Sequence, residues 1–103
     1  MIRLLSVAAA AASMAFLSPA VAQARAAPYY TATPAAAPAE TSYVTRNTVW
    51  ACNGGVCTAG RAADRAEFVC QRIAKSVGKL DSFSADGAPL DATALAKCNG
   101  RAK

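Results

Sequence analysis

Four cysteines constrain the fold of this chain more than any other feature of its sequence. They are Cys52, Cys57, Cys70 and Cys98, and all of them lie in the second half of a chain of 103 residues. An even number of cysteines in a short chain is typical of a disulfide framework when the chain is exported to an oxidising compartment. The role of the cysteines therefore depends on whether the chain has an export signal.

The N-terminus predicts such a signal. Arg3 supplies a positive charge, residues 4–17 form an apolar run, and residues 20–22 (Ala-Val-Ala) have the pattern of small residues at a cleavage site. We interpret residues 1–22 as a secretory signal peptide and expect a periplasmic or secreted protein. An N-terminal membrane anchor is the alternative, but an apolar run of about 14 residues is shorter than the roughly 20 that span a bilayer. We therefore expect no transmembrane helix in the mature chain.

Residues 23–42 differ in composition from the C-terminal half of the chain. They are rich in alanine, three prolines interrupt them, and before residue 42 the only bulky apolar side chains are Tyr29 and Tyr30. Prolines prevent a continuous helix, and so few bulky side chains cannot build a core. We predict a disordered linker. The two tyrosines are then either solvent-exposed or a docking element for a partner or for sugar rings.

The folded domain is predicted to occupy residues 43–99, with a tail over residues 100–103. Residues 43–52 are rich in β-branched and aromatic side chains, which favours a strand. Asn53-Gly54-Gly55 is a turn signal, so residues 43–58 are interpreted as a β-hairpin. A domain this short buries little apolar surface and depends on covalent stabilisation.

The rest of the domain is predicted to contain two helices and a strand. At helical spacing, residues 62–78 place their apolar side chains on one face, and Gly78 suits the end of a helix. Residues 80–84 alternate as a short strand, and Asp91 is placed to cap a helix over residues 92–98. The predicted fold is a small disulfide-stapled α+β domain with an N-terminal β-hairpin, a central amphipathic helix, a short strand and a short C-terminal helix.

Four cysteines allow three pairings, of which we favour Cys52–Cys57 and Cys70–Cys98. The first pair closes the tip of the hairpin, and the second joins the two helices. A zinc site is the alternative, but its ligands usually come as two close pairs, whereas 27 residues separate the last two cysteines. A thiol–disulfide oxidoreductase using Cys52 and Cys57 would be expected to have a C-x-x-C motif in a thioredoxin-like framework.

A row of basic residues lies opposite the apolar face of the predicted main helix, in a chain with a net charge of +5. Assuming a helix that starts near Gly60, the row consists of five basic residues with one phenylalanine among them: Arg61, Arg65, Phe68, Arg72, Lys75 and Lys79. Such a row can bind anions, and in an exported protein the partner would be an anionic envelope lipid or an acidic envelope protein. The alternative is a solvated face whose long side chains cover Phe68.

The composition excludes several kinds of chemistry. The chain has no histidine, which rules out histidine-based triads, histidine metal sites and c-type haem attachment. No pair of carboxylates is placed for acid–base catalysis, and the recognition motifs of nucleic-acid-binding proteins are missing. We expect a non-catalytic exported protein that binds a partner or has a structural role, without cofactor, metal or nucleic acid. Association with an anionic membrane surface is one alternative, and thiol–disulfide oxidoreduction is another.

One arrangement of residues resembles a known family. Trp50-x-Cys52-x4-Cys57, Cys70-x-Arg72, Val77-Gly78-x-Leu80-x-x-Phe83, Gly87-x-x-Leu90-Asp91 and Leu95-Ala96-x-Cys98-Asn99 are similar to the pattern of a family of small, uncharacterised secreted proteins of alphaproteobacteria. The resemblance covers residues 48–99, together with the signal peptide and the Ala/Pro-rich segment. It implies export into a Gram-negative envelope and no particular activity.

Overall fold

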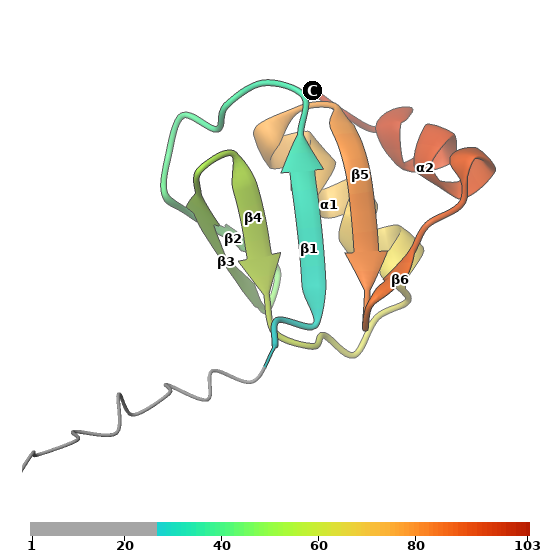
Figure 1. Ribbon diagram of the computed structural model, residues 1–103, viewed down its shortest axis with the longest axis horizontal. Coiled ribbons are helices and arrows are strands. Elements are labelled where there is room, and N and C mark those ends of the chain that lie inside the picture. The colour runs from blue at the N-terminus through green and yellow to red at the C-terminus, as the bar shows by residue number, and fades with distance from the viewer. Residues whose placement is uncertain (1–26) are drawn as a thin grey trace, which may run out of the picture.

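The computed structural model describes residues 27–103, so the predicted signal peptide and the first residues of the predicted linker lie outside the described residues. The described chain is an α+β fold, in which one helix packs against a face of an antiparallel sheet and the second helix packs beside the first, at one edge of the sheet (Figure 1). The elements are β1 (Tyr30–Pro34), β2 (Ser42–Thr45), β3 (Thr48–Asn53), β4 (Val56–Ala59), α1 (Ala66–Val77), β5 (Leu80–Ala85), β6 (Ala88–Pro89) and α2 (Ala92–Asn99). The predicted fold class is confirmed.

The first strand lies in the middle of the sheet, not in a linker. The strand order is β2-β3-β4-β1-β5-β6, so β1 pairs with β4 on one side and β5 on the other. The prediction of a disordered linker over residues 23–42 is wrong for residues 30–34. Alternate side chains of β1 point into the core, and Pro34 is tolerated because it ends the strand where the register with β5 shifts.

Tyr30 is a core residue, which also corrects the interpretation of the tyrosine pair as exposed or docking side chains. Its ring lies 6.0 Å from that of Trp50 and 5.8 Å from that of Phe83, measured between centroids. Its hydroxyl accepts a hydrogen bond from the backbone N–H of Ala62 at 3.3 Å and donates one to the same residue's carbonyl at 3.4 Å. Tyr29 is half-buried and packs edge-on against Tyr30.

The predicted hairpin is a three-stranded meander. Residues 43–52 do not form one strand, because a tight turn at Arg46 and Asn47 separates β2 from β3. Arg46 has a φ of 54°, a conformation that glycine and asparagine adopt more readily, so the sequence contains little sign of this turn. The hairpin of β3 and β4 is where it was predicted, and both Gly54 and Gly55 have the positive φ that its turn requires.

A register shift places two apolar side chains of β5 on the same face of the sheet. Leu80 and Phe83 are three residues apart, so simple alternation predicts that they point in opposite directions. The register changes from Thr33 opposite Ser82 to Pro34 opposite Leu80, which leaves Asp81 unpaired on β5. Both Leu80 and Phe83 are therefore buried against the helices.

The largest difference between the predicted and observed helices is at the start of α1, and the ends of both helices agree to within one residue. α1 begins at Ala66, not at residue 62, and buries Val69, Cys70, Ile73 and Ala74. Gly78 ends it with a φ of 91°. α2 begins where it was predicted, because Asp91 Oδ1 accepts a hydrogen bond from the backbone N–H of Ala94 at 2.7 Å.

The side chain of Asn99 joins the end of α2 to the start of β5 through two hydrogen bonds. Its Oδ1 accepts from the backbone N–H of Leu80, and its Nδ2 donates to the carbonyl of Leu80, both at 2.8 Å. Asn99→Ala leaves both backbone groups without a partner, so we expect a loss of about 2 kcal/mol in the free energy of unfolding. Urea unfolding measures it, with the exposed neighbour Lys97→Ala as control. Equal stability of the two variants would contradict the assigned role.

Candidate functional site

Both predicted disulfides are present. Cys52 and Cys57 are directly opposite each other on β3 and β4, with a Cα–Cα distance of 4.0 Å. Cys70 of α1 is bonded to Cys98 of α2, with a Cα–Cα distance of 5.8 Å. All four cysteines are buried, and Cys57 is fully inaccessible. Because thiol exchange requires access to a sulfur, this burial favours a structural role for both bonds.

The six residues of the predicted basic row do not share one helical face, because α1 begins at Ala66. Arg61 lies before the helix, and its guanidinium carbon is 5.6 Å from the centroid of the Tyr29 ring. Arg65 is the N-cap residue, and Lys79 follows the glycine that ends the helix. Only the remaining three residues of the row, Phe68, Arg72 and Lys75, are on α1.

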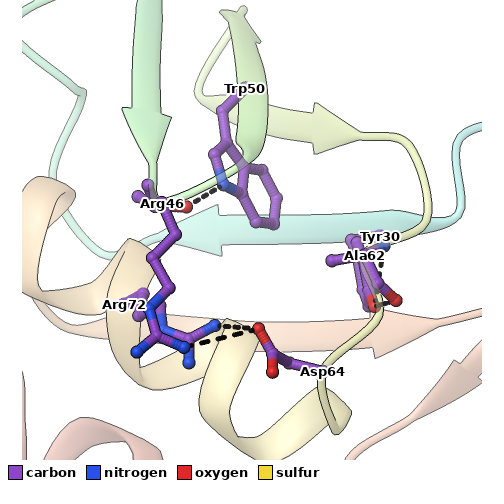
Figure 2. Close-up of polar contacts among 7 residues, drawn as sticks. Tyr30, Arg46, Trp50, Ala62, Asp64 and Arg72 are labelled. Atoms are coloured by element: carbon purple, nitrogen blue, oxygen red, sulfur yellow. Dashed lines mark hydrogen bonds and ion pairs between the residues drawn. The ribbon is translucent and has the colours of Figure 1, made fainter.

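One of these helical cations is already paired. Arg72 Nη1 lies 2.7 Å from Asp64 Oδ2, and Arg46 Nη1 lies 3.9 Å from the same oxygen (Figure 2). These are the only ion pairs between residues 27–103. Asp64 therefore compensates the charge of Arg72 and connects the β2–β3 turn to the segment before α1, so Arg72 is less available to an external anion than its position in the row suggests.

The cations at the other end of α1 have no such partner among the described residues. Lys79 and Lys103 line a cleft of about 630 Å³ beside α2, whose apolar wall includes Leu95. The backbone N–H of Lys103 donates to the carbonyl of Ala74 at 3.4 Å, so the C-terminal segment folds back onto α1. We call the two lysines that line this cleft, Lys79 and Lys103, the lysine cluster. Lys103 was missed because residues 100–103 were predicted to be a tail, and no local pattern predicts that they fold back onto α1.

A second, narrower cleft lies between the two helices. It has a volume of about 300 Å³ and is lined on the α1 side by Glu67, Phe68 and Gln71. Asp91, Thr93 and Lys97 line it on the α2 side. Phe68 is 47% exposed and is not part of the core. We call this cleft the interhelical groove.

The sheet face that points away from the helices carries two exposed apolar side chains. Val44 and Val49 are opposite each other on β2 and β3, and are 68% and 64% exposed. A shallow groove of about 490 Å³ lies between this face and Tyr29 and Arg61. The feature is an open apolar surface at the edge of the sheet.

Two kinds of site are missing from the described part of the chain. Between residues 27 and 103, no three histidine, cysteine, aspartate or glutamate side chains are grouped so that they could hold a metal ion. In the same residues, neither helix has the length and hydropathy needed to cross a bilayer.

Comparison with known proteins gives a family and no activity. No curated protein and no solved structure matches the chain. The model of a family of unknown function, DUF8200, matches residues 7–100 and so includes all the strands and both helices. On this match, the chain belongs to the DUF8200 family.

Proposed function

We propose that this chain is an exported, non-catalytic protein of the cell envelope that binds an anionic partner through the lysine cluster. Export is supported by the predicted signal peptide and by two buried disulfides, which persist in oxidising compartments. The resemblance to secreted alphaproteobacterial proteins favours a Gram-negative periplasm. Mass spectrometry of the protein recovered from cells tests this part: we expect an N-terminus at Gln23 and no free thiol.

The observation that supports binding is the distribution of charge at the two ends of the sheet. At the end where β4 finishes, Arg46 and Arg72 share the single carboxylate of Asp64, and the guanidinium of Arg61 lies over the ring of Tyr29. At the opposite end, Lys79 and Lys103 converge on the cleft beside α2, and neither is in an ion pair among residues 27–103. Unpaired cations beside an apolar wall suit an anionic lipid surface, where each lysine contributes about 1 kcal/mol of binding.

The test is binding to vesicles. The oxidised mature protein is expected to bind vesicles that contain phosphatidylglycerol and to be released by salt. Replacing two lysines, Lys79→Gln with Lys103→Gln, removes about 2 kcal/mol and weakens binding roughly 30-fold. Co-sedimentation with vesicles of increasing lipid concentration measures the change.

The control changes the same number of charges at the other end of the sheet. Arg46 is in the turn between β2 and β3, and Arg61 follows the end of β4, so both lie at the end of the sheet where β4 finishes. Lys79 lies at the opposite end, because β5 starts at Leu80, which pairs with Pro34 at the end of β1. Arg46→Gln with Arg61→Gln is expected to weaken binding less than about threefold, because neither arginine belongs to the lysine cluster. Equal weakening by both pairs, or equal binding to phosphatidylcholine vesicles in high salt, would overturn the proposal. If the protein binds an acidic envelope protein but no vesicles, the anionic partner is that protein and not a lipid, and the lipid proposal is overturned.

We do not propose thiol–disulfide oxidoreduction. The disulfide between Cys52 and Cys57 is the candidate for that chemistry, but it lies on the core side of the sheet with Cys57 fully inaccessible. An attacking thiolate would have to reach a sulfur on the buried face of the sheet.

A further inference from the structure

The interhelical groove has walls whose separation is set by a covalent bond. Glu67, Phe68 and Gln71 are on α1, and the other wall is the first part of α2. The disulfide from Cys70 to Cys98 joins these two helices and is buried beneath them. A groove held in this way needs little reorganisation to accept a ligand, which lowers the cost of binding.

Phe68 forms part of the groove without contributing to the core. The core cluster of α1 consists of Val69, Cys70, Ile73 and Ala74, with Ala66 and Val77 packed against it, and Phe68 is not included. Almost half of its surface is exposed to solvent. Phe68 therefore contributes little to the core, and its exposed ring is accessible to a ligand.

The polar groups around that ring have mixed hydrogen-bonding capacity. Glu67 and Asp91 accept, Lys97 donates, and the Gln71 amide and the Thr93 hydroxyl do both. None of the charged groups is in an ion pair among residues 27–103. A ligand that satisfies this set must itself donate and accept at several positions around an apolar face.

We propose that the interhelical groove binds a saccharide ring, with one face of the sugar against Phe68 and its hydroxyls on the polar groups. A sugar ring combines an apolar C–H face with hydroxyls that both donate and accept. Two carboxylates and one ammonium group give the lining a net charge of −1, so it disfavours phosphate and carboxylate ligands, in contrast to the lysine cluster. This site is separate from the proposed lipid contact, and either can fail without the other.

The test uses saturation-transfer NMR and calorimetry with two neutral probes, a β-1,4-linked N-acetylglucosamine trimer and a glucose trimer. We expect at least one of them to bind in the millimolar range, with saturation transferred to its ring protons. Phe68→Ala is expected to weaken binding at least about tenfold, and Phe68→Tyr to retain it, because the ring is kept. Because Phe68 lies outside the core, circular dichroism of both variants should match that of the wild type.

The matched control is Val49→Ala, which removes an exposed apolar side chain from the opposite face of the sheet and should leave saccharide binding unchanged. Absence of binding by both trimers, or equal binding by Phe68→Ala, would overturn the proposal. A third result would also overturn the proposal: an oligolysine peptide that binds more tightly than the trimer, displaces it completely and loses affinity in Phe68→Ala. That result would assign the groove to a basic peptide. Vesicle binding is measured on the same Phe68→Ala protein and should not change.

Discussion

Removing the disulfide between the helices, by Cys70→Ala with Cys98→Ala, is expected to lower the free energy of unfolding by about 3.5 kcal/mol. The bond closes a loop with a sequence separation of 28 residues, and the chain-entropy relation gives that value for a loop of such length. A domain of this size has a total stability of about 4–12 kcal/mol, at roughly 0.05–0.15 kcal/mol per residue. The substitution should therefore remove about a third or more of the total stability.

The other disulfide supplies the comparison. Cys52 and Cys57 are only five residues apart, so Cys52→Ala with Cys57→Ala should cost about 2 kcal/mol. Urea unfolding, followed by the fluorescence of the single and fully buried Trp50, measures both variants. A loss below about 1 kcal/mol for the Cys70–Cys98 variant would contradict the view that this bond holds the two helices together.

The features that could be predicted from sequence are those with a local or covalent signal. The cap of α2 requires only Asp91 and the helix after it, and both are adjacent in the chain. The β3–β4 hairpin is marked by Gly54 and Gly55. Once the hairpin and the helices are assigned, the cysteine pairs are determined, because Cys52 and Cys57 then face each other across two strands.

The features that were missed depend on residues far away in the chain. β1 is a strand because Tyr30 is opposite Ala59 on one side and Ala85 on the other, and neither partner is visible in the local sequence. Tyr30, Thr31 and Thr33 favour a strand, but the alanines and prolines around them lower the strand propensity of the segment as a whole, and its composition therefore indicated a linker. The turn at Arg46 was missed for a related reason, because its positive φ occurs without glycine.

The candidate site was predicted only in part, because it too depends on contacts between residues that are far apart in the chain. The basic row was placed with a helix that starts too early, and the pairing of Arg72 with Asp64 depends on how the loop before α1 folds back. The lysine cluster needs Lys103 to return to the carbonyl of Ala74. The interhelical groove exists only after two helices distant in sequence are packed together, so no motif could have predicted it.

The substitution Ala32→Asp tests the largest difference between the predicted and the observed fold, which is that residues 30–34 form a central strand and not a disordered linker. Ala32 lies at the centre of β1, is fully buried, and has Cys57 and Phe83 as its cross-strand neighbours. A carboxylate there would be surrounded by apolar side chains without a cation to pair with, so we expect a loss of more than about 4 kcal/mol and an unfolded domain. Circular dichroism and Trp50 fluorescence of the oxidised protein report the loss of structure.

The matched control is Ala36→Asp, four residues further along the same Ala/Pro-rich segment. Ala36 is exposed, so the same substitution should change stability by less than about 0.5 kcal/mol. A disordered linker would tolerate a carboxylate equally at both positions, whereas a central strand tolerates it only at residue 36. Equal stability of the two variants would mean that β1 does not complete the core. A large difference would mean that the segment before the first cysteine is as necessary to this fold as the disulfides are.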